Sequence, residues 1–247
     1  MIILRSADEI ATIGQAGAIL AATLEKLKKC AKPGVQTKEL DRIARDEILK
    51  RGGYPAFKGY KGFPGNICVS LNETVVHGIP SDRKLKDGDI LSIDIGVRFR
   101  DYYADAAVTL GMGEVSESAG RLIEVTRSAL YIGIEKAKPG RHLSDISHGI
   151  QEFVESNSFS VVRALVGHGI GTAIHEEPEV PNYGKPGLGP ILEPGMVLAI
   201  EPMVNQGTFE VETLDDGWSV VTKDRRLSAH FEHTIAITKK GAEILTK

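Results

Sequence analysis

Four acidic residues stand at matching positions in two related stretches of the sequence, and their types and spacing could serve metal chemistry. Asp94 and Asp105 lie in the first stretch, and Glu201 and Glu232 lie in the second. Each belongs to a strand-like run in which alternate residues share a face, and its neighbours on that face are mostly small. Four carboxylates that converge above one sheet could not all ionise unless cations neutralise them.

A histidine completes this set of candidate ligands. His168 lies in the glycine-rich segment Gly-His-Gly-Ile-Gly (167–171), after an apolar strand-like run. One imidazole and four carboxylates suit two divalent ions about 3.5–4 Å apart, bridged by carboxylates. Such a set favours Mn²⁺, Fe²⁺ or Co²⁺ over a thiolate-type zinc site. The glycines could also indicate a dinucleotide loop, but no strand–helix–strand pattern surrounds them.

The positions of the acids follow from an internal repeat. Residues 31–34 return as 137–140, residues 88–94 return as 195–201, and residues 105–110 return as 232–237. The matches keep the same order, and the first two have nearly the same offset. We therefore predict an α+β fold, built from duplicated halves at about 1–112 and 113–247 that form one domain around a pseudo-twofold axis. We expect a curved antiparallel sheet with helices on its outer side.

Periodicity and capping signals predict the elements that must position these residues. The predicted helices are one that Ser6 caps and Pro33 ends, one that Thr37 caps and Gly52 ends, and two over 118–137 and 144–156. Alternating or β-branched runs predict strands at 67–71, 89–98, 104–110, 161–166, 197–204 and 233–238, with a hairpin around 215–217. The stretch after Pro178 is expected to be rich in loops up to residue 197.

The composition is that of an ordinary globular protein. The chain has 247 residues, 42% of them hydrophobic, which excludes disorder and allows a sizeable core without disulfides. A net charge of −3 argues against a nucleic-acid partner. The two cysteines, Cys30 and Cys68, are typical of a reducing compartment, and neither a signal peptide nor a membrane span is recognisable. We expect a soluble, cytoplasmic protein.

Longer sequence motifs around the five candidate ligands resemble those of a known family. They are Ser-Ile-Asp-Ile-Gly (92–96), Asp-Tyr-Tyr-Ala-Asp-Ala-Ala (101–107), Gly-His-Gly-Ile-Gly (167–171), His-Glu-Glu-Pro (175–178), Glu-Pro-Met (201–203) and His-Phe-Glu-His-Thr (230–234). The ligand set resembles that of the pita-bread metallopeptidases. The motifs resemble those of the type I methionine aminopeptidases, and the resemblance covers nearly the whole chain. The resemblance implies the pita-bread fold and removal of the initiator methionine from nascent proteins and peptides, with a small second residue preferred.

The same resemblance implies roles for the ligands. Asp94 would hold one divalent ion and His168 and Glu201 the other, with Asp105 and Glu232 bridging the two. The ions would be Co, Mn, Fe(II), Ni or Zn. Glu201 would also carry the proton from the attacking water to the leaving amine.

Substrate-binding residues are implied in the same way. His175 would support the oxyanion at the scissile carbonyl, and His77 would contact the substrate backbone. The walls of an apolar pocket for the first side chain would be Tyr60, Phe63, Cys68 and Trp218, with Phe57 and Ile174 close by. Methionine, with its unbranched thioether, suits such a lining.

Further expectations concern ions and partners. Asn72, Thr74 and Ser228 resemble a monovalent-cation site of the family. We expect a monomer that acts on the N-termini of nascent polypeptides, with transient ribosome association and neither nucleic acid nor membrane as a partner.

Two other functions stay open at this point. Prolidase and aminopeptidase P, which cleave X-Pro bonds, share the ligand set, but they usually carry a further domain before the catalytic one. Here the catalytic half begins almost at once, at Ser6. A non-catalytic binding member of the fold is the second alternative, but such proteins lose ligands, and this sequence keeps all five. The zinc-finger extension of eukaryotic type I relatives and the helical insertion of type II are also absent from the sequence.

Overall fold

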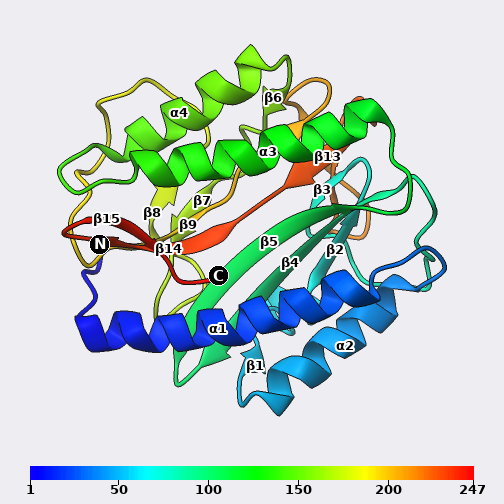
Figure 1. Cartoon of the computed structure of the whole chain (residues 1–247), viewed down its shortest axis with the longest axis horizontal. Helices are drawn as coiled ribbons and strands as arrows, with labels where there is room; N and C mark the ends of the chain where they lie inside the picture. Colours follow the sequence, from blue (N-terminus) through cyan, green and yellow to red (C-terminus); the bar gives the residue numbers. More distant parts are fainter.

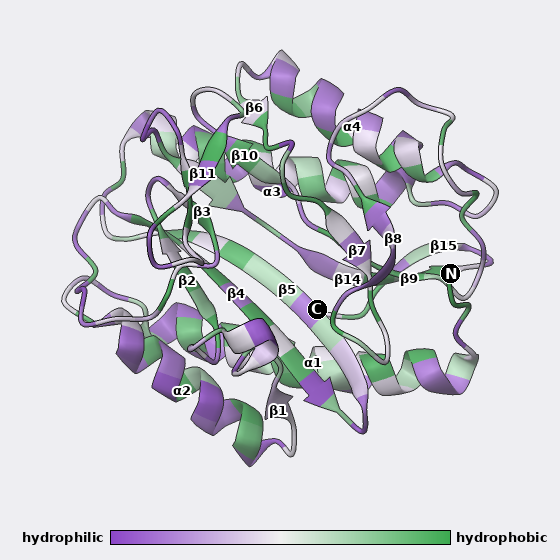
Figure 2. Cartoon of the chain, turned by 180° about the vertical axis from the view of Figure 1, so that it is seen from behind, coloured by the Kyte–Doolittle hydropathy of each residue, from purple (hydrophilic) through white to green (hydrophobic).

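Two pairs of helices lie at opposite edges of the molecule in the computed structural model, which describes residues 1–247 (Figure 1). The first pair is α1 (Ala7–Cys30) and α2 (Thr37–Lys50), and the second is α3 (Glu117–Lys136) and α4 (Leu143–Ser156). The strands lie between and behind the helices in that view, and Figure 2 shows them from the other side. None of the helices combines the length and apolar character that a membrane span needs.

The starts of the helices test the predicted caps. The capping box at Ser6 is confirmed, since its hydroxyl accepts from Glu9 N at 3.3 Å and Glu9 Oε2 accepts from Ser6 N at 2.8 Å. The prediction for Thr37 is wrong, because this residue is already helical and its hydroxyl exchanges hydrogen bonds with the backbone of Ser81. Ser144 likewise does not begin a helix, since α4 starts one residue earlier, after His142.

In the first half, two long strands form a hairpin that carries two of the acids. β4 (Ile90–Phe99) pairs antiparallel with β5 (Tyr102–Gly111) along its whole length. The other side of β4 pairs with the short strands β1 (Tyr54–Pro55) and β2 (Cys68–Leu71). The apolar face predicted for this segment is confirmed, since the four residues on it are fully buried: Leu91, Ile93, Ile95 and Val97.

In the second half, the corresponding strands lie in a five-stranded sheet. Its order is β15 (Gly241–Ile244), β14 (His233–Thr238), β9 (Val197–Ile200), β7 (Gly167–Gly169) and β8 (Glu176–Val180). Two smaller sheets flank it. One is β13 (Ser228–His230), β10 (Met203–Asn205) and β6 (Ser160–Val161), and the other is β11 (Val211–Thr213), β12 (Val220–Thr222) and β3 (Thr74–Val76). A short 3-10 helix, η1 (Tyr60–Gly62), lies before β2.

The two halves meet where β5 runs beside the start of β14. Glu232 N donates to Ala107 O at 2.9 Å, and the hydroxyl of Thr234 both accepts from Asp105 N and donates to Asp105 O. The strands divide into four hydrogen-bonded sheets, and this contact joins the two largest at the centre of the molecule. It places an acid of each half, Asp105 and Glu232, beside the other.

Some strand predictions fail for an identifiable reason. Of the predicted strand 161–166 only Val161 is paired, at the end of the two-residue strand β6, and the apolar residues 164–166 line a cavity instead. The predicted strand 197–204 is broken into β9 and β10. Two further strands, β8 and β15, form where we expected loop or the end of the chain.

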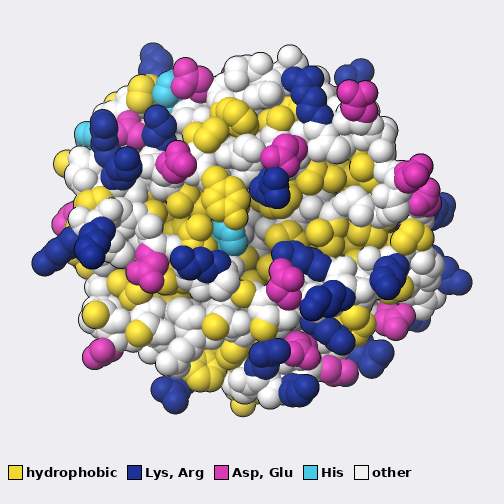
Figure 3. Space-filling view, viewed as in Figure 1, with side chains coloured by type: hydrophobic (Ala, Val, Ile, Leu, Met, Phe, Trp, Pro, Cys, Tyr) yellow, Lys and Arg dark blue, Asp and Glu magenta, His cyan; other side chains and the backbone are white.

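A second cavity opens on the face of the molecule that α1 and α3 flank. Between α1 and α3, above β5, a cavity of about 530 Å³ is lined by apolar residues such as Leu24 and Leu130 together with His233. Charged side chains of both signs are interspersed around it on this face (Figure 3). His233, the first residue of β14, lines this cavity and follows Glu232 of the acid cluster on the chain.

Candidate metal centre

The structure brings the five predicted ligands to one site. Asp94 on β4 and Asp105 on β5 share a face, since Asp94 pairs with Ala107 while Asp105 pairs with Gly96. His168 lies in the middle of β7 and Glu201 directly follows β9. Ligand atoms of Asp105, His168 and Glu232 all lie within 4.8 Å of one another.

The acids occupy two depths. Asp94, His168 and Glu201 line a cavity of about 310 Å³, whereas Asp105 and Glu232 lie beneath it and are only 4% and 2% exposed. Three carboxylate oxygens are buried without any hydrogen-bond partner: Asp94 Oδ1, Asp105 Oδ1 and Glu232 Oε1. Buried acceptors are costly unless a donor or a cation satisfies them. These orphaned oxygens therefore fit a site built for cations.

The electrostatics of the cluster lead to the same conclusion. Burial raises the pKa of Glu201 to about 7, although the neighbouring His168 opposes this shift. Burial also raises the pKa of Asp94 to about 6, where the charge of Glu201 adds to the effect and that of His230 opposes it. The pKa values of Asp105 and Glu232 are raised well above their ordinary range by burial and by the other carboxylates. Divalent cations would remove both penalties.

His168 is oriented as a ligand. Its Nδ1 donates to the carbonyl oxygen of Gly169 at 2.9 Å, so the lone pair lies on Nε2, 3.5 Å from Glu201 Oε1. The glycines on either side are required by packing. A Cβ at Gly167 would lie 2.4 Å from Ala199 O, and one at Gly169 would lie 2.2 Å from Glu177 O. The Gly-x-Gly segment thus brings the imidazole close to two neighbouring strands.

His230 is a residue of the site to which the sequence analysis gave no role. It is 1% exposed, and its Nε2 lies 3.5 Å from Glu201 Oε2 without a hydrogen-bond partner. Burial lowers its pKa, although the charge of Asp94 opposes this. The signal available in the sequence was its position two residues before Glu232, which favours the same face.

Aromatic residues form one wall of the 310 Å³ cavity. The ring of Phe63 makes edge contacts with Phe57 and Trp218, with centroids 6.5 and 5.1 Å apart. Cys68 pairs with Asp94 across the sheet, and burial and the nearby acids raise its thiol pKa. The other lining residues are Tyr60, Lys61, Val76, His77, Ala164, Leu165, Val166, His175 and Met203. Lys61, Val76, Met203 and residues 164–166 were missed from the sequence.

One predicted pocket residue lies elsewhere. Ile174 is 2% exposed and does not line the cavity. It packs instead in the buried hydrophobic cluster that also contains Phe57, Phe63 and Cys68. Its side chain points into the core because the loop that carries it turns its other residues, Thr172, Ala173 and His175, toward solvent.

Two histidines stand at the mouth of the cavity. His175 stacks on Tyr60, and its Nδ1 lies 2.9 Å from the Tyr60 hydroxyl. Desolvation and the neighbouring His168 and Lys61 lower its pKa to about 3. His77 has a left-handed backbone with φ of 60°, and desolvation and His230 lower its pKa to about 4. Both rings are therefore neutral at pH 7 and can donate or accept hydrogen bonds.

The residues predicted for a monovalent cation lie together on neighbouring segments. Asn72 O accepts from Ser228 N at 2.9 Å, and Thr74 is the first residue of β3. The Asn72 side chain is already bound, to Asp89 and to Ile90 N. The Ser228 hydroxyl donates to Asn205 Oδ1 at 2.8 Å.

The fold and the cluster together define a class of protein. Duplicated α+β halves bring four carboxylates, with three buried orphaned oxygens among them, and one oriented imidazole to the floor of a cavity with apolar walls. Such an oxygen-rich set suits a pair of divalent ions that act in hydrolysis.

Comparisons with known proteins place the chain more narrowly. The family model described as Metallopeptidase family M24 matches residues 11–239. Methionine aminopeptidase 1 of Bacillus subtilis is 56% identical over 247 residues, which cover 100% of both chains. The crystal structure of methionine aminopeptidase from Thermotoga maritima is 47% identical, covers 100% of both chains and has a TM-score of 0.98. The chain belongs to metallopeptidase family M24 and, within it, to the methionine aminopeptidases.

Several predictions are confirmed by this membership. The pita-bread fold and the resemblance to methionine aminopeptidases are confirmed, and the chain is a metal-dependent hydrolase. The prolidase of Pyrococcus furiosus is 24% identical with a TM-score of 0.80, and the match covers 99% of this chain and 65% of that one. At that identity the likeness extends to the fold alone.

Proposed function

We propose that this chain removes the initiator methionine from nascent proteins and peptides by metal-assisted hydrolysis at the five-residue centre, with a small second residue preferred. The observation that carries the proposal is the position of the buried acid cluster at the floor of a cavity of about 310 Å³ with aromatic walls. Membership of the methionine aminopeptidases supports the same reaction.

The ligand roles that the family resemblance implies are supported by the grouping of these side chains. Asp94 would hold one ion and His168 and Glu201 the other, while the deeper Asp105 and Glu232 would be shared. The ions, when bound, supply a polarised carbonyl and a water of lowered pKa. Oxygen-rich coordination favours Mn²⁺, Fe²⁺ or Co²⁺, and Ni²⁺ or Zn²⁺ remain alternatives.

Glu201 is the proposed acid and base. Its carboxylate lines the cavity beside His168, with Oε1 3.5 Å from His168 Nε2, where it can first accept a proton and later release it. The carboxylate would take a proton from the attacking water and deliver it to the leaving amine. His230, 3.5 Å from Glu201 Oε2, faces the carboxylate from the other side.

The two histidines at the cavity mouth would handle the substrate backbone. The Tyr60 hydroxyl can donate to Nδ1 of His175, which leaves the proton of this neutral ring on Nε2. An Nε2–H at this place can donate to the oxyanion that develops on the scissile carbonyl. His77, also neutral, would contact the peptide backbone.

Side-chain selectivity comes from the apolar wall. Phe57, Tyr60, Phe63, Cys68 and Trp218 present aromatic and sulfur surfaces that suit a thioether. The buried Ile174 would fix the shape of this wall from the core rather than touch the substrate.

A peptide assay tests the proposal. We expect the protein, reconstituted with Mn²⁺ or Co²⁺, to release methionine from a Met-Ala peptide and to be inactive after chelation. An Xaa-Pro peptide and an N-acetylated Met-Ala peptide should not be cleaved, and Glu201→Gln provides the matched inactive control. Cleavage of the Xaa-Pro peptide instead would establish the dipeptidase alternative, and cleavage of neither would favour a non-catalytic binding role.

Other expectations from the sequence belong to this proposal without further support. They are the cytoplasmic location, the monomeric state, the transient ribosome association and the monovalent cation near Asn72, Thr74 and Ser228. Co-sedimentation with ribosomes and gel filtration test two of them directly. A K⁺ titration of the melting temperature, with Ser228→Ala as the comparison, tests the cation site.

A further inference from the structure

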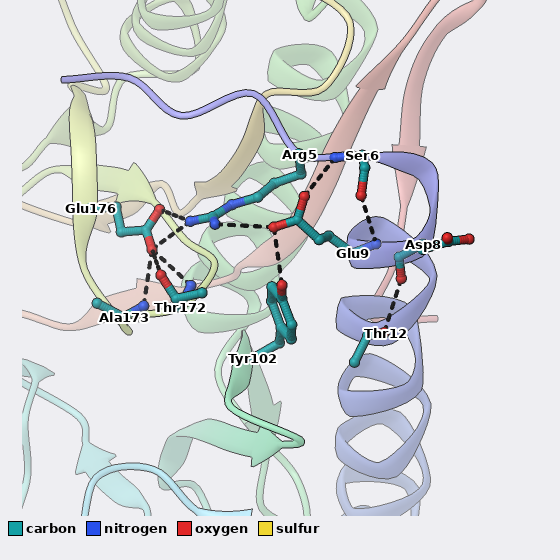
Figure 4. A network of polar contacts seen from close by, with 9 residues as sticks. All are labelled: Arg5, Ser6, Asp8, Glu9, Thr12, Tyr102, Thr172, Ala173 and Glu176. Carbon is teal, nitrogen blue, oxygen red and sulfur yellow. Dashed lines mark hydrogen bonds and ion pairs between the residues drawn. The ribbon is translucent and has the colours of Figure 1, made fainter.

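A buried arginine near the start of the chain reaches the loop that carries His175 (Figure 4). Arg5 precedes α1 and is 8% exposed. Its Nη2 donates to both carboxylate oxygens of Glu176, at 2.7 and 2.5 Å, although 171 positions separate the two residues. The backbone N of Arg5 donates to Gly195 O at 2.7 Å, so its own segment is anchored beside the second half.

Glu176 closes the loop on which His175 lies. Its Oε1 accepts from Thr172 N at 2.7 Å, from Ala173 N at 2.9 Å and from the Thr172 hydroxyl at 3.1 Å. Although burial opposes it, the pKa of Glu176 is lowered by these bonds and by Arg5, which keeps the carboxylate charged. One carboxylate therefore ties both ends of the turn 172–176 together, and Arg5 is the cation that holds it.

The last glycine of the Gly-x-Gly-x-Gly segment provides space for this arginine. A Cβ at Gly171 would lie 2.3 Å from Arg5 Nη2 and 2.6 Å from Arg5 Cζ. Gly167 and Gly169 are required by backbone contacts around His168, so Gly171 has a separate reason. Its carbonyl oxygen also accepts from Tyr103 N at 2.8 Å, which fixes the loop to the start of β5.

His175 stands directly before Glu176, and its ring depends on where this turn places it. The ring must reach the Tyr60 hydroxyl and lie beside His168, whose ring is tilted by 51° and has its centroid 4.2 Å away. We propose that Arg5 is a positioning residue that, through Glu176, holds the turn 172–176 so that His175 faces the substrate carbonyl. The proposal rests on the function proposed above for His175.

The other contact of Arg5 offers an internal control. Nη1 lies 3.5 Å from Glu9 Oε1, and Glu9 is also bound by Ser6 N and by the Tyr102 hydroxyl. Glu9 therefore belongs to the cap of α1, whereas Glu176 ends the turn 172–176 and is the first residue of β8. If Arg5 acted only by anchoring α1, loss of Glu9 would have the same effect on catalysis as loss of Glu176.

A double-mutant cycle on the metal-loaded enzyme tests the proposal. We expect His175→Ala to lower kcat on a Met-Ala peptide by roughly 10²-fold. Arg5→Ala in the wild-type background should lower kcat by about 10- to 100-fold, because a displaced catalytic group loses most of its effect. In the His175→Ala background the same change should lower kcat less than about threefold, since residues that act through one another are not additive.

Other variants separate positioning from folding. Arg5→Lys keeps the charge but not the planar guanidinium that contacts Glu176 and Glu9 at once, so it should restore only part of kcat and replaces Arg5→Ala if that variant does not fold. Glu176→Gln should reproduce the loss. Glu9→Gln should lower the melting temperature and leave kcat within about twofold. Arg51→Ala, which breaks the exposed pair of Arg51 with Glu47 at 2.8 Å, should change neither.

A spectroscopic measurement does not depend on turnover. In metal-free protein labelled at histidine, the imidazole signal missing from His175→Ala identifies His175. We expect this signal to shift or broaden in Arg5→Lys and Glu176→Gln, while the signals of His142 and His148, which do not line the cavity, stay unchanged.

Two results would overturn the proposal. One is that Arg5→Ala lowers kcat as much in the His175→Ala background as in the wild type. The other is that Arg5→Lys and Glu176→Gln leave the His175 imidazole signal unchanged. Wild-type protein without activity on Met-Ala peptides would instead refute the proposed function, and the histidine signals would still decide the position of the loop.

Discussion

The two halves of the molecule place acids at corresponding strands but connect those strands very differently. In the first half, β4 and β5 are joined by Arg100 and Asp101, both with positive φ, and pair over ten residues. In the second half, β9 and β14 pair over four residues, and the chain between them runs from residue 201 to 232. The tight hairpin of the first half thus corresponds to a long connection in the second half, residues 201–232, which we call the excursion.

The excursion carries much of the chemistry that the hairpin does not. Met203, Trp218 and His230 all lie on it and reach the cavity or Glu201. The first half contributes Asp94, Asp105 and the buried wall residues, which are continuous with its hydrophobic core. On the proposed function, the first half would supply two metal ligands and most of the apolar wall as a support, while the second half would add three ligands, among them the proton carrier Glu201.

Variants of the corresponding acids Glu201 and Asp94 provide the strongest test of whether the two halves have different roles. We expect Glu201→Gln to lower kcat on a Met-Ala peptide by roughly 10²- to 10⁴-fold at any metal concentration, because proton transfer is lost along with a ligand. Asp94→Asn should also be impaired at low metal, but a large part of its activity should return as Mn²⁺ is raised. Steady-state assays over a Mn²⁺ titration, with calorimetric metal binding, measure both.

The contrast fails if excess Mn²⁺ restores both variants equally. Glu201 would then be a ligand and no more, and the proton carrier would have to be sought elsewhere, with His230 as the nearest candidate. Equal and permanent inactivity of both variants would likewise remove the distinction between support and proton carrier.

The pocket residues Trp218, from the second half, and Phe57, from the first, allow a second test with a smaller expected effect. Trp218 lies half-buried on the excursion, held by Asp216, which accepts from the backbone N of Trp218 and of Ser219. We expect Trp218→Ala to raise KM about 10-fold, equivalent to one lost apolar contact of about 1.4 kcal/mol, with little change in melting temperature. Initial-rate kinetics and thermal unfolding provide the two measurements.

Phe57 is the matched residue of the first half. It is buried in the core cluster and packs against Gly96, so Phe57→Ala should destabilise the protein by about 3–5 kcal/mol. A large loss of stability from Trp218→Ala, or a change in KM alone from Phe57→Ala, would contradict the assignment of the two walls.

The sequence predicted which acids lie together because the signals for them are local. Alternation along single strands placed Asp94 opposite the buried face of Ile93 and Ile95, and the internal repeat indicated which acids correspond. The helices were similarly predictable, since the capping box and apolar period that form α1 lie within a few residues of one another.

The sequence predicted less where contacts join distant segments. His230 reaches Glu201 only because β10 and β13 pair, and Arg5 meets Glu176 across 171 positions. Apolar residues 164–166 gave the pattern of a strand although they line the cavity. Thr37 looked like a cap, but it binds Ser81 instead. In each case a tertiary contact, absent from local periodicity, decides the role.

The smallest expected effect concerns the stability of the metal-free protein, to which the acids of both halves contribute. The pKa of Glu201 rises from 4.5 to about 7 and that of Asp94 from 3.8 to about 6, with burial the main cause in each. An acid with a raised pKa keeps its proton in the folded state when the unfolded chain has released it. The folded state then binds more protons than the unfolded state. For each acid, the free energy of unfolding therefore falls as pH rises from its unfolded-state pKa to its folded-state pKa, and is flat above the latter.

For the protein in chelator we therefore expect the melting temperature to fall by roughly 5 °C between pH 5 and pH 7.5. Asp94→Asn should reduce the slope mainly below pH 6, and Glu201→Gln should reduce it up to pH 7. With saturating Mn²⁺ the trend should reverse, because metal binding displaces the same protons and tightens as they leave. A melting temperature that rises with pH in chelator would mean that neither half holds its acids protonated, and the cluster would not then be an electrostatic strain relieved by metal.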